Sequence, residues 1–297
     1  MTATATLERL NRQFRLKDGR QVGFAEYGDP GGVPIIYCHG WPSSRLEPRT
    51  VETLLEGMPV RVIAPDRPGY GLSDFQTSRR IDDWPNDVSE LADHLGLKKF
   101  AVLGVSGGGP YSIACAARIP ERVSAVGVVS GLAPLERAGL TQGMVPLNRR
   151  LLNLARVMPW SAQRLGMVLL QFFWREGNQV IPPAIEARLS ESDRRALESA
   201  ELREGLIAAS VEALRGGFMG PARDGFLYAR PWGFSLRDIK TQIRLWHGEK
   251  DVVVPPVMGH YLAEQLPNCR ATFTPDDGHF SLPYGRIREV LESLLAG

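Results

Sequence analysis

Cysteine is scarce in this sequence, and long apolar runs are missing. The three cysteines, Cys38, Cys115 and Cys269, are an odd number, and each lies in an apolar segment. We therefore expect buried free thiols rather than a disulfide framework. The sequence contains no run of about 18 apolar residues, the length that can span a bilayer. The first residues also lack the apolar stretch of a signal peptide. These absences favour a cytoplasmic protein with no membrane span.

An excess of either charge is also lacking. The 297 residues carry 35 Lys and Arg against 33 Asp and Glu, a formal net charge of +2. No dense basic block could follow a phosphate backbone, so no nucleic acid is expected as a partner. Histidines and cysteines lack metal-site spacings such as C-x-x-C or H-E-x-x-H, so we expect no metal and no other cofactor. With 43% hydrophobic residues, the chain can build a large core. We expect it to be a monomer or a homodimer.

Short apolar segments that alternate with helical patterns indicate a sheet buried on both faces. A hairpin is predicted around Asp18-Gly19, because apolar and polar residues alternate on both sides of this turn. Further strands are predicted at 35–38, 60–64, 100–105, 123–130, 243–247 and 270–274, with helices at 84–95 and 106–118. The predicted fold is α/β, with a doubly wound, mostly parallel sheet of about eight strands.

The alternation stops after the sixth strand, for roughly a hundred residues. Apolar stretches at 147–158 and 165–174, and a capping box at 190–193 that opens a helix towards Leu202, predict a helical lid. The predicted organisation is a first core part at 1–133, a lid at 134–232 and a second core part at 233–297. The Met, Phe and Trp side chains of the lid form either its own core or the wall of an apolar acyl pocket.

The motif that points to chemistry is Gly104-Val105-Ser106-Gly107-Gly108, a G-x-S-x-G between an apolar strand and a helical pattern. Small residues at 104 and 108 allow a sharp reversal, and the strained serine lifts its hydroxyl clear of the turn. The same glycines could serve only a tight strand–helix turn, as in dinucleotide-binding folds. That alternative requires G-x-G-x-x-G after the first strand, which is absent. Ser106 is the predicted nucleophile.

Several motifs together resemble the α/β-hydrolase superfamily over essentially the whole chain. His39-Gly40-Trp41-Pro42, after a predicted strand, is similar to the family's oxyanion loop. The segment Asp66-Arg67-Pro68-Gly69-Tyr70-Gly71-Leu72-Ser73-Asp74 resembles the turn after the family's next strand, and we interpret its charged residues as holding that turn. The resemblance implies a serine nucleophile activated by a histidine and a carboxylate.

His279 and Asp251 are the partners that the resemblance assigns to Ser106. His279 lies in Asp276-Asp277-Gly278-His279-Phe280, where the family places its catalytic histidine. Asp251 follows a predicted strand, and the order serine, aspartate, histidine is that of the family. The other acids nearby, Asp276, Asp277 and Glu249, fit turn or solvent-facing roles better.

Backbone N–H groups of Trp41 and Gly107 are the predicted oxyanion hole, because Gly107 follows the nucleophile and Trp41 lies on the facing loop. The imidazole of His39 fits an organising role in its loop better than a chemical one. As substrate contacts we name His39, Phe173, Trp174 and Phe280.

The expected reaction is hydrolysis of a carboxylic ester of a small to medium, partly apolar molecule through an acyl-enzyme. The HGWP segment also resembles epoxide hydrolases and haloalkane dehalogenases, but those relatives use an aspartate where this chain has Ser106. Perhydrolysis, lyase chemistry and carbon–carbon bond hydrolysis can use the same triad. A slow-turnover ligand receptor with a hydrolase fold is the alternative from another class of protein. An aminopeptidase would need lid carboxylates in the pocket, and nothing in the sequence places Glu186, Glu191 or Glu204 there.

Overall fold

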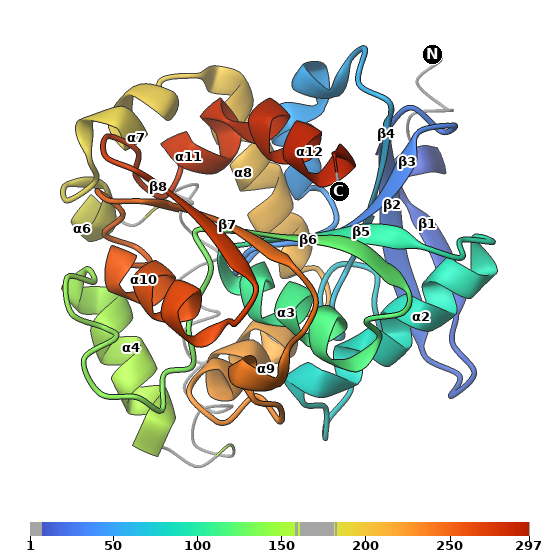
Figure 1. The fold of residues 1–297 in the computed structure, drawn as a ribbon, viewed down its shortest axis with the longest axis horizontal. Coiled ribbons are helices and arrows are strands. Elements are labelled where there is room, and N and C mark those ends of the chain that lie inside the picture. Colours follow the sequence, from blue (N-terminus) through green and yellow to red (C-terminus); the bar gives the residue numbers. More distant parts are fainter. Residues whose placement is uncertain (1–7, 158–159, 161–180, 182, 297) are drawn as a thin grey trace.

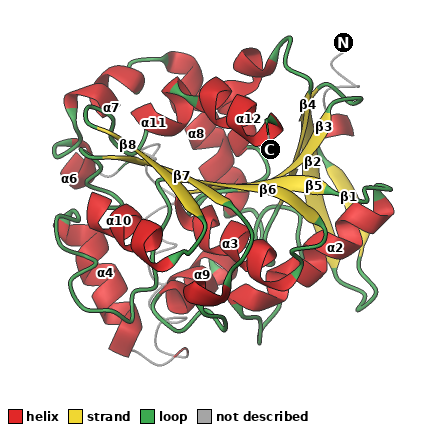
Figure 2. Cartoon of the chain, viewed as in Figure 1, coloured by secondary structure: helices red, strands yellow, loops and turns green. Residues whose placement is uncertain are grey.

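One sheet organises the part of the chain that the structure describes. The computed structural model describes residues 8–157, 160, 181 and 183–296. Within them, eight strands follow the order β1-β2-β4-β3-β5-β6-β7-β8 (Figures 1 and 2). β2 is antiparallel to β1 and β4, and the other neighbouring pairs are parallel. The predicted mostly parallel α/β fold is confirmed. The strands are β1 (Arg12–Arg15), β2 (Gln21–Gly28), β3 (Val33–Cys38), β4 (Val60–Pro65), β5 (Phe100–Val105), β6 (Val123–Val129), β7 (Ile243–Gly248) and β8 (Cys269–Thr274).

Helices cover both faces of this sheet (Figure 1). Along β3, Ile35 and Ile36 belong to different hydrophobic cores, as do Leu103 and Val102 along β5. Because both faces are covered, the central strands are apolar throughout and not in alternate positions only. The core of Ile36 includes side chains of α2 (Trp84–His94), α3 (Gly109–Arg118) and α10 (Pro256–Gln265), and the core of Ile35 includes those of the 3-10 helix η1 (Glu47–Leu55) and α12 (Ile287–Leu295).

The described part of the segment between β6 and β7 consists of helices joined by loops. It contains α4 (Pro146–Val157), α6 (Pro183–Glu186), α7 (Glu191–Ala196), α8 (Ala200–Ala213) and α9 (Met219–Tyr228). The predicted continuous helix from Ser190 towards Leu202 is wrong. Ser190 caps α7, but Ser199 Oγ accepts the N–H of Leu202 at 3.3 Å and starts α8 as a separate helix. The predicted helix at 165–174 lies outside the described residues, and the boundaries 134–232 stay a prediction.

Two of the three cysteines are buried free thiols, as the sequence predicts. Cys38 and Cys115 are buried and free, as predicted, whereas the free Cys269, on the edge strand β8, is partly exposed. Among the described helices, none is long and apolar enough to cross a bilayer.

Truncation of one core side chain tests the two-faced sheet. Ile36→Ala removes a side chain that is 0% exposed, whereas Val33, at the start of the same strand, is 43% exposed. We expect Ile36→Ala to lower the free energy of unfolding by about 2–5 kcal/mol, because a buried cavity is left behind. Val33→Ala should change it by about 0.5 kcal/mol or less. Urea unfolding measures both, and equal losses would contradict this assignment of the core.

Candidate active site

Ser106 lies at a strained reversal between β5 and α3. Its φ angle is +54°, a left-handed conformation that residues with a side chain rarely adopt. The chain turns here through the short 3-10 helix η3 (Ser106–Gly108) before α3 begins. Strain of this kind costs on the order of 1–3 kcal/mol and is characteristic of functional sites. The side chain of Ser106 is partly exposed at the carboxyl end of the sheet.

Glycines make this turn possible because backbone fills the space around it. A Cβ atom at Gly108 would lie 1.9 Å from the carbonyl oxygen of Cys38, and one at Gly104 would lie 2.5 Å from the oxygen of Gly108. Both distances are far below van der Waals contact. Glycine at 104 and 108 therefore lets the turn after β5 pack directly against the end of β3 and against β5 itself.

His279 and Asp251 form a buried pair on two other loops at this edge of the sheet. His279 Nδ1 lies 2.7 Å from Asp251 Oδ2. The other carboxylate oxygen, Oδ1, accepts the N–H groups of Val253 at 2.9 Å and Val254 at 2.8 Å, which fixes the orientation of the carboxylate. An acceptor on Nδ1 places the proton there and leaves Nε2 as the basic nitrogen.

The neighbouring acids are held by other partners. Asp276 pairs with Lys250 at 2.7 Å, and Asp277 pairs with Arg286 at 2.7 Å. Glu249 Oε1 lies 3.1 Å from Nε2 of His260. Of the acids considered from the sequence, Asp251 alone is shown in contact with His279 within the described residues.

Charge around His279 overcomes the effect of its burial. Burial by itself lowers the pKa of an imidazole. Here the charge and hydrogen bond of Asp251, followed by the charges of Asp193 and Glu47, outweigh burial and raise the pKa of His279 above its usual 6.5. The raised pKa means that this site stabilises an imidazolium ion, the form that a general base becomes once it has taken a proton.

The loop after β3 packs directly against the turn of Ser106. A Cβ atom at Gly107 would lie 3.3 Å from the backbone nitrogen of Trp41, so these two residues are adjacent. A Cβ atom at Gly40 would lie 3.7 Å from Cβ of Ser106 and 3.3 Å from Oε2 of Glu47. This arrangement brings Trp41 and Gly107, the two predicted oxyanion donors, together beside Ser106.

Glu47, at the start of η1, holds this loop from behind. Its Oε2 accepts the N–H of Gly40 at 2.7 Å, and its Oε1 accepts the hydroxyl of Tyr37 at 2.9 Å. The carboxyl group is buried, and burial raises its pKa despite these hydrogen bonds. The sequence analysis missed Glu47, because nothing in its spacing separates it from a surface acid.

His39 hydrogen-bonds within its own loop and to the loop after β4. Its Nδ1 lies 2.9 Å from the oxygen of Gly40, and its Nε2 accepts the N–H of Arg67 at 3.2 Å. The ring is fully buried, and burial together with the charge of Arg67 holds its pKa well below 6.5. With both nitrogens bound to backbone, His39 is not available as a substrate contact, which corrects that assignment.

Asp224, on α9, is a second acid that the sequence analysis missed. It is fully buried and accepts hydrogen bonds from Arg67 at 2.8 Å and from the Tyr70 hydroxyl at 2.7 Å. Arg79 and Tyr111 donate to its other oxygen. Burial alone would raise the pKa of this carboxyl, but the two guanidinium charges outweigh burial and hold it far below its usual range.

Through these partners, α9 is bonded to both sides of the Ser106 turn. Arg67 donates to the carbonyl oxygens of His39 and of Gly40, the latter at 2.9 Å. The hydroxyl of Tyr228 donates to the oxygen of Gly107 at 2.8 Å, and Trp41 Nε1 donates to the oxygen of Pro221 at 2.8 Å. Arg67 was predicted to hold its own turn, but the hydrogen bonds of its guanidinium group go to the loop of His39 and to Asp224.

The remaining predicted substrate contacts divide between two regions. The ring of Phe280 stands edge-on to His279, with centroids 5.3 Å apart, and it is partly exposed. Phe173 and Trp174 lie outside the described residues.

Among the described residues, no group of three or more His, Cys, Asp or Glu side chains could hold a metal ion.

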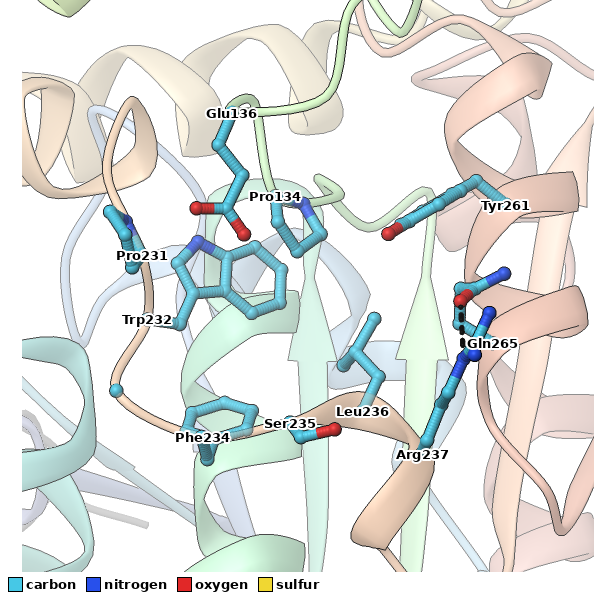
Figure 3. A pocket seen from close by; sticks show the side chains of 11 residues that line it. Pro134, Glu136, Pro231, Trp232, Phe234, Ser235, Leu236, Arg237, Tyr261 and Gln265 are labelled. Atoms are coloured by element: carbon cyan, nitrogen blue, oxygen red, sulfur yellow. Dashed lines mark hydrogen bonds between the residues drawn. The ribbon is translucent and has the colours of Figure 1, made fainter.

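A cavity of about 500 Å³ lies away from these groups, between α10 and the loop after α9 (Figure 3). Trp232 and Pro134 line it together with Tyr261, and Arg237 donates to Gln265 Oε1 at 3.0 Å on its rim. None of Ser106, Asp251 or His279 lines this cavity. It is therefore not the pocket in which Ser106 would meet a substrate.

The elements described above match a known family. The family model for the alpha/beta hydrolase fold matches residues 33–285, most of the chain. The chain belongs to the α/β-hydrolase family. In this α/β-hydrolase the matched region begins at β3 and includes Ser106, Asp251 and His279.

Relatives of different activities resemble this α/β-hydrolase. Haloalkane dehalogenase 2 of Mycobacterium tuberculosis is 38% identical over 112 residues, which span 37% of this chain and 38% of the dehalogenase. The 2-hydroxymuconate semialdehyde hydrolase of Pseudomonas putida is 26% identical over 296 residues, 94% of each protein. Among solved structures, esterase RhEst1 from Rhodococcus sp. ECU1013 has a TM-score of 0.67 at 22% identity, covering 97% of this chain and 99% of the esterase. The match to the dehalogenase spans less than half of either protein, and the likeness to the esterase shows the fold.

Replacement of Asp224 tests the buried charge cluster. In Asp224→Asn, Arg67 and Arg79 keep their positive charges but lose the carboxylate between them. We expect the free energy of unfolding at pH 7 to fall by about 3–5 kcal/mol, because unpaired buried charges are costly. The pKa of Asp224 is depressed on folding, so its contribution is complete above about pH 4 and is lost as pH falls further. Urea unfolding at several pH values measures this, with the exposed Asp238→Asn as control. Equal losses in the two variants at pH 7 would contradict the cluster's role.

Proposed function

We propose that this α/β-hydrolase is a serine hydrolase that cleaves carboxylic esters of small to medium, partly apolar molecules. The observation that carries the proposal is the combination of Ser106 at φ +54° with the His279–Asp251 pair at 2.7 Å. A strained, partly exposed serine and an oriented, basic imidazole are the two parts that nucleophilic acyl transfer requires.

In the proposed mechanism, His279 takes the proton of the Ser106 hydroxyl as its oxygen attacks the ester carbonyl. The resulting oxyanion receives hydrogen bonds from the N–H groups of Trp41 and Gly107. The tetrahedral intermediate collapses, the bond to the alcohol oxygen breaks, and His279 returns its proton to the alcohol. Water then attacks the acyl-enzyme with His279 again as base, which releases the acid and restores Ser106.

Support for the oxyanion assignment comes from the adjacency of Trp41 and Gly107 and from the bonds that hold their loops. Tyr228 and Arg67 bind backbone carbonyls of these loops, so the donors need not reorganise when charge develops. We further propose that residues 134–232 form the lid and that Phe280, with Phe173 and Trp174 of the lid, lines the pocket. The partner of the enzyme is then a small-molecule ester.

A second candidate function is hydrolysis of a carbon–carbon bond. The relative that covers 94% of this chain, from Pseudomonas putida, is a 2-hydroxymuconate semialdehyde hydrolase. The leaving group would be a carbanion stabilised as an enolate, which would take the proton of His279 in place of an alkoxide, and the same serine would carry the acyl group. Dehalogenation receives less support, because the family's dehalogenases attack with a carboxylate and this chain has Ser106 at that position.

Replacement of the nucleophile tests the proposal. Ser106→Ala should lower kcat on p-nitrophenyl esters, from acetate to decanoate, by about 10³- to 10⁶-fold, leaving only residual catalysis. Ser112→Ala, a buried serine within α3, is the matched control and should keep most of the activity. If the native enzyme is inert on every ester, or Ser106→Ala keeps its rate, ester hydrolysis is not its reaction. The 2-hydroxymuconate semialdehyde class is then the next substrate to assay.

The dependence of the rate on pH tests the role of His279. Only neutral His279 can accept the serine proton, and its pKa is raised above 6.5. We expect kcat/KM to fall as pH is lowered through a midpoint above 6.5. In Asp251→Asn the midpoint should move to lower pH, because the main charge that raises the pKa is removed. A midpoint below 6.5 in the native enzyme would contradict His279 as the base.

A further inference from the structure

Asp193 belongs to the segment between β6 and β7, on α7, yet its carboxylate reaches into the loop that carries His279. The side chain is fully buried. Oδ2 accepts the N–H of His279 at 2.9 Å, and Oδ1 accepts the N–H groups of Phe280 at 2.8 Å and Ser281 at 2.9 Å. The hydroxyl of Ser281 also donates to Oδ1, at 3.1 Å. One carboxylate thus holds three consecutive peptide groups that begin at His279.

The loop is shaped to receive this carboxylate. A Cβ atom at Gly278 would lie 2.2 Å from Asp193 Oδ2 and 2.5 Å from Ser190 Oγ. The φ angle of Gly278 is not in the left-handed region, so it is the contact with α7, and not the backbone conformation, that excludes a side chain here.

Further contacts fix α7 on this loop. Ser192 Oγ donates to the oxygen of Asp276 at 2.6 Å, and the N–H of Asp193 donates to Ser190 Oγ at 3.1 Å. The first bond joins α7 to the loop, and the second caps the helix that carries Asp193. Figure 1 shows α7 beside α11 (Ser281–Gly285), the short helix that continues from the His279 loop.

We propose that Asp193 is a positioning residue, which holds the backbone at His279 so that the imidazole stays aligned with Asp251 and Ser106. The proposal rests on the proposed function, because it assigns Asp193 a part in a reaction that uses His279 as base. It makes α7 a structural part of the catalytic apparatus, and not only of a cover above it.

The negative charge of Asp193 also acts on His279. The charged groups that face this imidazole are Asp251 from the loop after β7, Asp193 from α7 and Glu47 from η1, and all three raise its pKa. His247, on β7, lies beyond Asp251, with Nε2 3.9 Å from Asp251 Oδ2. A loss of charge at 193 is therefore expected to lower the pKa of His279, whereas a mere loosening of the fold is not.

The experiment compares Asp193→Ala and Asp193→Asn with the native enzyme on a p-nitrophenyl ester. Rates are expressed per active site, counted with a fluorophosphonate that labels Ser106, so that unfolded protein does not contribute. A small displacement of a catalytic group can cost about 10²-fold. We expect kcat of Asp193→Ala to fall about 10- to 100-fold with KM within about two-fold, and its acid limb to move to lower pH. Asp193→Asn should regain part of kcat, because its amide oxygen can still accept hydrogen bonds from Phe280 and Ser281. Its acid limb should stay shifted to lower pH, because the charge is not restored.

Glu191→Gln is the matched control, since Glu191 lies on the same helix with its side chain 79% exposed. It should behave as the native enzyme. If kcat per active site and the acid limb are native in Asp193→Ala, and only the unfolding midpoint falls, the proposal is overturned. A failure of the proposed function itself would show differently, as esterase activity that is absent from the native enzyme or retained by Ser106→Ala.

A double-mutant cycle tests the same contact from the other side. Gly278→Ala places a methyl group against Asp193, so alone it should lower kcat per active site as Asp193→Ala does. In the Asp193→Ala background the methyl group no longer meets the carboxylate and meets only Ser190 Oγ, so it should lower kcat by a smaller factor than it does in the native enzyme. Fully multiplicative effects would mean that Gly278 and Asp193 act independently, and would overturn the proposal.

Discussion

The arrangement of the candidate active site depends on a steric constraint. The turn at Ser106 leaves no room for side chains at the glycines beside the serine. Gly108 touches the carbonyl of Cys38, and a Cβ atom at Gly109 would lie 3.0 Å from Cα of Gly131. The turn after β5 therefore packs through its backbone against the end of β3 and against the loop after β6. This contact brings Trp41 beside Gly107 and leaves the serine side chain as the group that projects from the turn.

Three buried carboxylates hold the loops around that turn, and their partners give them different electrostatic roles. Glu47 binds a peptide N–H and a phenol, and burial raises its pKa. Asp224 binds two guanidinium groups, which hold its pKa far below the usual range. Asp193 binds the peptide groups of one loop. The neutral donors that bind Glu47 and Asp193 orient a loop without adding charge. The arginine Arg67, in contrast, binds both Asp224 and a carbonyl oxygen of another loop, and so connects the two.

The sequence was sufficient for the sheet and for the residues with local signals. Apolar runs bounded by turns predicted the strands, and the glycines around Ser106 marked a turn that needs them. Asp251 could be selected from its neighbours because it lies in the loop after a strand and completes the order serine, aspartate, histidine of the family that the chain resembles. Ser190 was correctly predicted to start a helix. Ser199 caps a second helix, so the prediction of one continuous helix was wrong.

Glu47, Asp193 and Asp224 could not be found in the same way. Each is separated from its partner loop along the chain, by 7 to 157 residues, and carries no local pattern that distinguishes it from a surface acid. Their roles arise from tertiary contacts, which periodicity and motif spacing do not encode. His39 was misassigned as a substrate contact for the related reason that the motif reveals its loop but not the direction of its ring.

The position of Asp224 has a consequence for how such a chain could be divided or recombined. Arg67 and Arg79 come from the loop after β4, while their shared counter-ion comes from α9, more than 140 residues later. A shortened enzyme made by deleting the helices between β6 and β7 would leave the two guanidinium groups without their shared counter-ion. A chimera with the helices of a relative would meet the same difficulty unless the donor supplied an acid at the equivalent place. In this chain the segment between β6 and β7 therefore also supplies the counter-ion of two buried arginines in the scaffold.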